Sequence, residues 1–477
     1  MKIAFISNKI EPTGGDHILQ QHIVSLSHLG HTTDLYIQDI PKDPNQYDLI
    51  VVSGQGGAIK GLDINHPKKI WLLQNYDPYI FGFRDDINKL YDHYQNYIVY
   101  SKDLANIVQH HHGKKNIVMI PNGVEFDDLV KYQKITKCHK KSIVWMAGYM
   151  GGLKGGKLAN DVFKELNFRG WHTISITATG DKLPNAQTHY TNPSFSDKCQ
   201  IIANCNLMLH TSIFETFCLC IMESMALGTP VIGTNSLGNM EYCTNDNYVT
   251  TTRDVNAIVN AIEDLYNSPK YALLQKNGIQ TASTHNWANI IKSVEAGYAQ
   301  FIGMEYEYNL ATKGFIAEDI AEHIVTLREY ADKCESVTEL GVRTGASTRA
   351  FLASKCSKLV SIDIIPMHDD VKRLMPIYKK NWIYLQANDL HIQIEPTDLL
   401  FIDTYHTGEQ LEQELRLHAD KAKKYIILHD TTTWGQLGHG GVKGLNYAVT
   451  DFLNRNTNWT TEKVYTNNNG LTILRRC

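Results

Sequence analysis

The first 300 residues alternate short apolar segments with longer segments in which apolar residues recur at helical spacing. Such alternation predicts buried parallel strands joined by amphipathic crossover helices. The predicted strands of a first series are Lys2–Ser7, Thr33–Ile37, Leu49–Ser53, Lys69–Leu73, Tyr97–Tyr100 and Ile117–Ile120. Those of a second series are Ser142–Ala147, Thr173–Thr177, Leu207–His210 and Pro230–Gly233, followed by a helix over Asp254–Tyr266.

A third series begins after Glu305, with a long helical pattern over Glu318–Lys333. Its predicted strands are Ser336–Leu340, Lys358–Ile362, Trp382–Leu385, Asp398–Ile402 and Lys424–Leu428. The polar segment Lys131–Lys141 has no apolar periodicity, so it predicts a connection between the first two series. A chain of 477 residues is long enough for about three compact units. We therefore expect an α/β protein with three doubly wound units over residues 1–135, 136–303 and 306–477.

The composition is that of a globular protein, with 43% hydrophobic and 20% charged residues. A formal net charge of -4 without a Lys/Arg stripe argues against a nucleic-acid partner. No apolar run approaches the roughly 20 residues that span a bilayer, so no integral membrane segment is expected, while a peripheral contact stays open. The chain enters a strand without a secretory leader, and its nine cysteines include no C-x-x-C pair. These features favour reduced cysteines and a cytoplasmic location.

Gly14 and Gly15 lie between the first predicted strand and the helix that follows it. Glycines at such a turn allow backbone amides to approach a ligand, and the helix N-terminus favours negative charge. A Gly-Gly pair by itself is more often only a turn.

Two glutamates, Glu215 and Glu223, stand eight residues apart, and the second opens the segment E-S-M-A-L-G-T-P-V. A glycine-rich segment over residues 148–155 precedes them and contains Lys154. Over about residues 1–300 the chain thus resembles the GT-B glycosyltransferases of the large retaining family 4. The resemblance implies two Rossmann-like domains that hold a nucleotide-sugar between them.

The resemblance also implies roles for single residues. Glu223 would bind the ribose hydroxyls, catalytic Glu215 would contact the sugar, and Lys154 would neutralise the diphosphate as negative charge builds on it. The complete implied donor set is Gly14, Gly15, Lys154, Gly155, Glu215, Phe217 and Glu223. Transfer to a glycan or glycoconjugate acceptor would proceed with retention, without a protein nucleophile or a metal. Two departures from the family pattern are Tyr149 where an arginine is usual, and Thr216 and Cys218 where glycines are usual.

The third series contains a strand, a glycine-rich turn and a helix over Val337–Thr348, and its next strand ends in Asp363. A carboxylate at that place can accept hydrogen bonds from both ribose hydroxyls of a nucleoside cofactor. The spacing resembles that of class I S-adenosylmethionine-dependent methyltransferases, and NAD is less favoured because G-x-G is missing. The resemblance implies S-adenosylmethionine bound by Glu339, Gly341, Gly345, Ser347, Asp363, Asn388 and Asp389.

Further polar residues follow two later strands of this series: Asp403 and His406 after one, His429 and Asp430 at the end of the next. Parallel strands end at the same sheet edge, so Asp403, Asp430 and His429 could share a hard cation such as Mg²⁺. His406 could then deprotonate an acceptor hydroxyl that the metal acidifies, although a lone histidine there could equally cap a helix. Over residues 306–477 the pattern resembles metal-dependent O-methyltransferases that act on sugars, including a final hairpin around Asn467–Leu474.

Together these features predict a bifunctional enzyme that adds a sugar to a glycan and O-methylates a sugar hydroxyl. The alternative is a sugar O-methyltransferase whose GT-B half only binds glycan, which the absent arginine favours.

Overall fold

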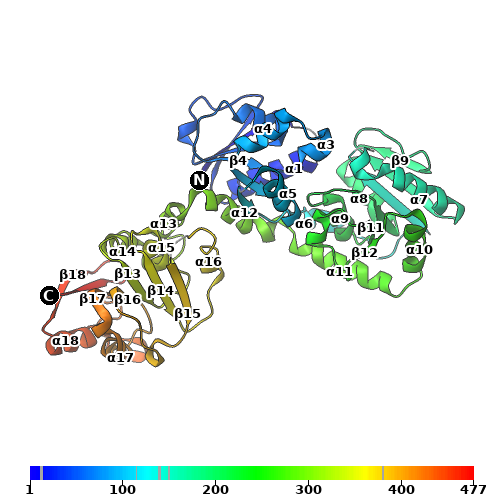
Figure 1. Ribbon diagram of the computed structural model, residues 1–477. Coiled ribbons are helices and arrows are strands. Elements are labelled where there is room, and N and C mark those ends of the chain that lie inside the picture. Colours follow the sequence, from blue (N-terminus) through cyan, green and yellow to red (C-terminus); the bar gives the residue numbers. More distant parts are fainter. Residues whose placement is uncertain (11–13, 114, 138–140, 149–150, 379–380) are drawn as a thin grey trace. The chain divides into compact units, whose positions relative to one another are not determined.

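The computed structural model describes residues 1–477 except 11–13, 114, 138–140, 149–150 and 379–380. The chain divides into two compact units, Met1–Tyr298 and Ala299–Cys477, and the division falls inside helix α12 (Trp287–Ile302) (Figure 1). Among the described residues, no helix combines the length and the apolarity that crossing a bilayer requires.

The first sheet of the N-terminal unit is six-stranded and parallel, with the order β2-β1-β3-β4-β5-β6. Its strands are β1 (Lys2–Ser7), β2 (Thr32–Ile37), β3 (Leu49–Ser53), β4 (Lys69–Leu72), β5 (Asn96–Val99) and β6 (Asn116–Met119). Its helices are α1 (Gly14–His28), α2 (Gly54–Gly61), α3 (Asp77–Phe81), α4 (Asp85–His93) and α5 (Lys102–His112). The strand order reverses between β1 and β3, so the loop after β1, which leads to Gly14, opens at a position that favours ligand binding.

The second sheet of this unit is also six-stranded and parallel, with the order β12-β11-β10-β7-β8-β9. Its strands are β7 (Ser142–Ala147), β8 (His172–Thr177), β9 (Thr188–Thr191), β10 (Leu207–His210), β11 (Val231–Thr234) and β12 (Tyr248–Thr251). Its helices are α7 (Gly156–Phe168), α8 (Phe195–Asn204), α9 (Leu219–Ala226), α10 (Val255–Tyr266) and α11 (Lys270–Thr284), with the short α6 (Phe126–Leu129) before them. The order reverses between β7 and β10, and these are the strands that Lys154 and Glu215 follow.

The C-terminal unit has one seven-stranded sheet with the order β15-β14-β13-β16-β17-β19-β18. Its strands are β13 (Ser336–Leu340), β14 (Lys358–Asp363), β15 (Asn381–Gln386), β16 (Thr397–Ile402), β17 (Ala422–His429), β18 (Trp459–Tyr465) and β19 (Leu471–Arg476). Its helices are α13 (Met304–Thr312), α14 (Ile324–Ala331), α15 (Ala346–Ala353), α16 (Asp369–Lys372), α17 (Gly408–His418) and α18 (Leu445–Arg455). Strands β13 to β17 are parallel, whereas β19 runs antiparallel between β17 and β18. The order reverses between β13 and β16, where the glycine-rich turn and Asp403 both lie.

The predicted long helix over Glu318–Lys333 is wrong: the structure has a 3-10 turn at Ala321–His323 and helix α14 from Ile324. Tertiary contacts take the backbone groups that a longer helix would use. The Asn468 amide donates to the carbonyl of Glu318 at 2.7 Å, and the amide of Glu322 donates to the Asn468 side chain at 3.1 Å. The helix is therefore shorter than predicted, because a residue distant in the sequence takes up these backbone groups.

Candidate functional site

Lys154 and Glu215 meet at the carboxyl edge of the second sheet. The Lys154 Nζ donates to both Glu215 carboxylate oxygens, at 2.8 and 2.9 Å, and the Ser212 hydroxyl donates to one of them at 2.7 Å. Burial alone would raise the pKa of Glu215, but the charge of Lys154 holds that pKa below its usual value. Both side chains are therefore charged at neutral pH.

Gly155 allows the loop after β7 to approach the loop after β10. Its φ of +67° is in the left-handed region, and a Cβ there would overlap the carbonyl of Thr211. A larger residue would separate the two loops that bring Lys154 and Glu215 together.

A second lysine–glutamate pair joins α8 to α9. The Lys198 Nζ donates to the Glu223 carboxylate at 2.8 Å. Burial lowers the pKa of Lys198, and the charge of Glu223 more than offsets this and raises it. Lys198 was not predicted, because 25 residues separate it from Glu223 and no local spacing links them.

Gly14 and Gly15 are the first residues of α1, whereas the sequence predicts that they lie in a turn before the helix. The Gln74 side-chain amide donates to the Gly15 carbonyl at 2.6 Å, and a Cβ on Gly15 would overlap that side chain. A Cβ on Gly14 would lie 3.5 Å from Leu219, in the first turn of α9. The two glycines thus lie within reach of the helix that carries Glu223.

His17, one turn into α1, is a polar residue of this region that the sequence argument did not select. It forms an ion pair with Glu125. The hydrogen bond to Glu125 raises the pKa of His17, burial opposes it, and the nearby Glu223 charge raises it further. Glu125, His17, Lys198 and Glu223 therefore form one charged group.

The other residues in or near the predicted donor site lie in different environments. The Phe217 side chain is buried against Tyr242, at 4.8 Å between ring centroids, so it packs in the interior. The Thr216 hydroxyl donates to the Gln74 carbonyl at 2.7 Å. Tyr149, where an arginine is expected, lies outside the described residues.

In the C-terminal unit, the glycine-rich turn joins β13 to α15. Gly341 has a φ of +84°, and a Cβ there would overlap the carbonyl of Asp403 at the end of β16. The Asp363 carboxylate accepts hydrogen bonds from the amides of Val342 and Arg343 at 2.8 and 2.9 Å. The turn is therefore held directly between the acid after β14 and the acid after β16.

Glu339 lies beneath this turn and is fully buried. The hydroxyls of Ser347, Thr348 and Ser361 donate to its carboxylate, at 2.5, 2.9 and 2.7 Å. Burial raises the pKa of Glu339 to about 7 even though these hydroxyl groups favour the charged form. The structure thus brings Glu339, Ser347 and the glycine turn together.

Asn388 and Asp389 lie after β15. The Asn388 side chain accepts from the amide of Leu390 at 2.9 Å and so caps the 3-10 turn Asp389–His391. The Asp389 carboxyl faces that of Glu414: burial and this carboxyl together raise the pKa of Glu414 well above its usual value. Their predicted contact with a cofactor stays a prediction.

Asp403, His429 and Asp430 come together at the carboxyl edge of the sheet. One potential ligand atom from each lies within 4.8 Å of the others. His429 Nδ1 is 3.3 Å from an Asp403 oxygen, without the alignment of a hydrogen bond. His406 Nε2 lies 2.7 Å from Asp430 and 3.7 Å from Asp403.

The chemistry of these donors fits a divalent cation. His429 Nε2 faces the carbonyls of Asp319 and Asn468, at 3.2 and 3.3 Å, so its hydrogen is directed away from the acids. His429 Nδ1 and Asp430 Oδ1 are buried without a hydrogen-bond partner among the described residues. Burial lowers the pKa of His429, but the charges of Asp403 and Asp430 raise it to about 9, so a cation bound here would displace the Nδ1 proton. A ligand histidine whose other ring N–H donates to a carbonyl is typical of metal sites.

His406 packs against two ring side chains of the loop between β17 and α18. Its ring is stacked with Trp434 at 5.8 Å and with His439 at 5.2 Å between centroids. Burial lowers the pKa of His406, but its bonds to Asp403 and Asp430 raise it to about 9. Trp434 and His439 were not predicted, because only the folded loop brings them to His406.

Comparison with known proteins gives matches to the N-terminal unit. The family model described as "Glycosyl transferases group 1" matches residues 178–281. Sucrose-phosphate synthase (tll1590) from Thermosynechococcus elongatus is similar in structure, with a TM-score of 0.54 at 16% sequence identity, covering 63% of this chain and 98% of that one. A glycosyltransferase from Rickettsia africae gives 0.52 at 14% identity, with the same coverage.

HepE from Anabaena, solved with UDP and glucose, gives a TM-score of 0.50 at 18% identity, covering 63% of this chain and 98% of its own. No curated protein matches the sequence. The α/β fold with Rossmann-like parallel sheets is thus that of GT-B glycosyltransferases, as the sequence predicts. More particularly, residues 178–281, in the part of this unit that contains the second sheet, match the glycosyl transferases group 1 family model.

Proposed function

We propose that the chain is a bifunctional enzyme that modifies glycans. Its N-terminal unit transfers a hexose or deoxyhexose from a nucleotide-sugar to a glycan acceptor, with retention. Its C-terminal unit O-methylates a sugar hydroxyl with S-adenosylmethionine. A covalent link between the two activities raises the effective concentration of one product at the other site.

The two lysine–glutamate pairs support the transfer reaction. As the sugar leaves the nucleotide, negative charge builds on the diphosphate, and Lys154 would be the cation that stabilises it. Glu215 then exchanges its bonds to Lys154 for bonds to sugar hydroxyls, while Glu223 accepts from the ribose. Lys198, held on Glu223 at 2.8 Å, supplies the second cation that the sequence lacks at Tyr149.

The single observation that carries the methylation proposal is the convergence of Asp403, His406, His429 and Asp430 beside the glycine turn. Asp403, His429 and Asp430 would hold the cation, which when bound acidifies the acceptor hydroxyl. Asp363 and the turn amides would hold S-adenosylmethionine, the source of the methyl group. Bound there, S-adenosylmethionine would supply the methyl group to the acceptor oxygen, and His406 Nε2 would take the proton of that hydroxyl.

The protonation state of His406 depends on its two acidic neighbours. With Asp403 and Asp430 unneutralised its pKa is about 9, which favours the charged imidazolium. When those carboxylates are neutralised by a cation, the charges that raise its pKa are removed and His406 can accept a proton.

Two assays of the full chain test the proposal. Incubation with a panel of nucleotide-sugars should release nucleoside diphosphate, and a Glu223→Ala variant should lose that release. Incubation with methyl-labelled S-adenosylmethionine, Mg²⁺ and methyl glycosides should give a methylated sugar, and an Asp403→Ala variant should not. Absence of methyl transfer to every sugar, with S-adenosylmethionine unbound, would contradict the C-terminal assignment.

A second candidate is a methyltransferase whose N-terminal unit only binds glycan. It is favoured by Cys218 at a position where a glycine is usual, because the Cys218 sulfur lies within 4.8 Å of a Glu215 carboxylate oxygen. Methyl transfer without hydrolysis or transfer from any nucleotide-sugar would establish this candidate in place of the bifunctional enzyme.

A further inference from the structure

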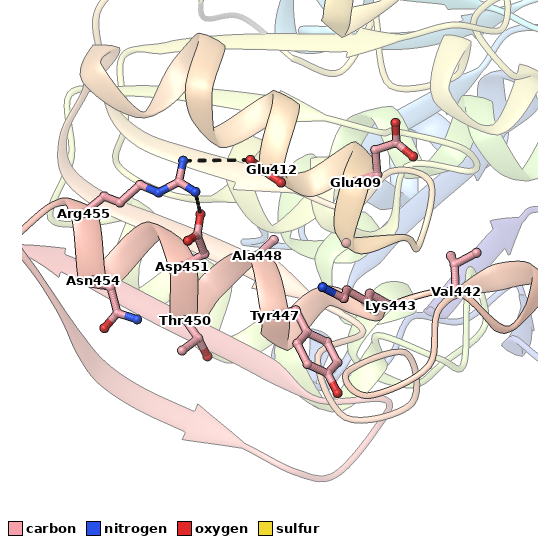
Figure 2. Close-up of a pocket in the computed structure, with 11 residues that line it drawn as sticks. Glu409, Glu412, Val442, Lys443, Tyr447, Ala448, Thr450, Asp451, Asn454 and Arg455 are labelled. Carbon is pink, nitrogen blue, oxygen red and sulfur yellow. Dashed lines mark ion pairs between the residues drawn. The ribbon is translucent and has the colours of Figure 1, made fainter.

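A groove of about 760 Å³ lies between helices α17 and α18 of the C-terminal unit (Figure 2). Glu409 and Glu412 line it from α17, and Tyr447, Asp451 and Arg455 line it from α18, with Lys443 in the loop before α18. Its volume is in the range of about 300 to 1,000 Å³ typical of small-molecule sites. The groove is therefore large enough for a ligand of several rings.

The charges at one end of the groove are already paired. Arg455 lies 2.8 Å from Asp451 and 4.0 Å from Glu412, as the dashed lines of Figure 2 show. Glu412 also accepts from Arg416 at 2.8 Å. A ligand at this end meets hydrogen-bonding groups rather than free charge.

The other end offers one carboxylate and one aromatic ring. The Glu409 side chain has no hydrogen bond or ion pair among the described residues. Tyr447 is 50% exposed, and the Lys443 Nζ lies 5.7 Å from the centre of its ring. An exposed ring beside a lysine, with a free carboxylate elsewhere on the same lining, suits a ligand that has hydroxyl groups and a C–H face.

The lining excludes two other classes of ligand. Its three carboxylates and two cations make it unsuitable for a purely apolar ligand, because burying those groups without partners is costly. An excess of carboxylates also disfavours a polyanion. A neutral polyhydroxylated ligand meets neither obstacle.

We propose that this groove binds a neutral oligosaccharide, namely the part of the acceptor glycan adjacent to the sugar that is methylated. This inference rests on the proposed methyltransferase function of the same unit. Hydroxyl groups of the glycan donate to Glu409 and accept from Lys443 and Asn454, and one sugar ring lies on Tyr447.

One end of the groove lies close in the chain to His406. Gly408, which lines the groove, is two residues after His406, and its amide donates to the Lys443 carbonyl at 2.8 Å. The amide of His439 donates to the His406 carbonyl at 2.9 Å. A glycan whose terminal sugar is at His406 Nε2 therefore needs to pass only the Thr407–Gly408 segment to enter the groove.

The test uses the full chain and a panel of neutral oligosaccharides of increasing length, each titrated calorimetrically without S-adenosylmethionine. We expect the affinity to rise with length. Tyr447→Ala and Glu409→Gln should each weaken binding of the best oligosaccharide by about tenfold, the loss expected for one aromatic or charged hydrogen-bonding contact. Gln413→Ala, on the exposed side of α17 and outside the groove, is the matched control and should bind as the parent chain does.

Three results would contradict the proposal that the groove binds a neutral oligosaccharide. They are that no neutral oligosaccharide binds, that the two variants bind as tightly as the control, or that anionic glycans bind in preference. Circular dichroism confirms that each variant folds, and the surface position of Glu409 makes Glu409→Gln the variant least disturbed. Oligosaccharide binding that depends on Tyr447 and Glu409, without any methyl transfer, would contradict the proposed function alone. Methylation of oligosaccharides with the same KM in both variants would contradict the groove alone.

Discussion

At the scale of single residues, the loss of Lys154 and the loss of Asp430 should have different consequences. Lys154 is the cation that neutralises Glu215, whose side chain is only 12% exposed. Asp430 is almost fully buried, and one of its oxygens has no partner among the described residues. Removing the Lys154 cation leaves the Glu215 charge uncompensated, whereas removing the Asp430 carboxylate would delete one of the three proposed metal ligands.

We expect Lys154→Met to abolish binding of nucleoside diphosphates and to destabilise the N-terminal unit. The loss should be about 2 kcal/mol, less than for a fully buried pair because both side chains keep some exposure. Titration with a panel of nucleoside diphosphates and urea denaturation measure the two effects. Lys157→Met, on the exposed side of α7, is the control, and equal affinity of both variants for the nucleoside diphosphate that binds the parent chain best would refute the role of Lys154.

Asp430→Asn should weaken Mg²⁺ binding at least about tenfold and abolish methyl transfer, because one of three ligands is lost. S-adenosylmethionine should bind it with unchanged affinity. Calorimetric titration with MgCl₂ and then with S-adenosylmethionine separates the two. Asp420→Asn, an exposed acid of the same unit, should behave as the parent chain; identical Mg²⁺ binding by both variants would exclude the metal site.

His22 makes the N-terminal unit sensitive to acid. Its buried ring bonds the Tyr298 hydroxyl at 2.8 Å, and burial lowers its pKa to about 3 from an unfolded value of 6.5. The unfolded chain therefore binds more protons below pH 6.5, so stability is full above that pH and falls as pH decreases. At pH 5 this protonation lowers the free energy of unfolding by about 2 kcal/mol. Urea denaturation at pH 7 and pH 5 should show a smaller decrease for His22→Gln; an equal decrease would contradict this assignment.

At the level of secondary-structure elements, the strands that could be predicted from the sequence are those buried on both faces. Strands β3 and β10 are buried at every position, and their continuous apolar runs predict them with the observed bounds. Edge strand β9 (sequence THYT) is half exposed and polar, so neither alternation nor apolar content marks it. β12 was missed for the same reason.

The candidate sites were partly predictable on similar grounds. Lys154, Glu215, Asp403 and Asp430 each follow a predictable strand, and parallel strands open at one edge. Lys198 and His17 lie on helices and Trp434 lies in a loop, and the approach of these three residues to the sites depends on tertiary packing. No spacing in the sequence expresses that packing.

Helix α13 is joined to the glycine turn by a buried charge cluster. The Arg349 guanidinium donates to Glu307 at 2.9 Å and to the carbonyls of Thr344 and Gly345 at 3.0 and 2.9 Å. Arg373 donates to the same glutamate at 2.8 Å. Glu307 and Arg349 are both fully buried.

We expect Arg349→Met to destabilise the C-terminal unit by about 3 to 5 kcal/mol, because Glu307 loses a buried partner. S-adenosylmethionine should also bind more weakly, since two carbonyls of the turn lose their donor. Thermal denaturation and ligand titration measure these effects. Adding Glu307→Leu should recover part of the stability; a double variant no more stable than the single one would contradict the buried-charge explanation.

At the scale of the whole molecule, each unit has its own cores. One core of the C-terminal unit contains Leu327, Phe351 and Phe401, and another contains Leu400, Leu428 and Phe452. None of these residues belongs to the N-terminal unit. The two units should therefore fold separately.

A fragment over residues 303–477, which begins after α12, should fold and bind S-adenosylmethionine as tightly as the full chain. Calorimetric heating of the full chain should give two transitions, one of which matches the fragment. Circular dichroism and titration check the fragment. An unfolded fragment, or one that does not bind a cofactor that the full chain binds, would show that the N-terminal unit is needed for folding.

Strand β19 lies inside the C-terminal sheet, between β17 and β18, although it follows both in the sequence. During translation the N-terminal unit can fold while this sheet still lacks an interior strand. The C-terminal sheet is thus completed only when residues 471–476 have left the ribosome. A nonsense mutation or proteolytic cut just before Leu471 would therefore yield a chain with a folded N-terminal unit and an incomplete C-terminal sheet, without the methyl transfer that we propose for it.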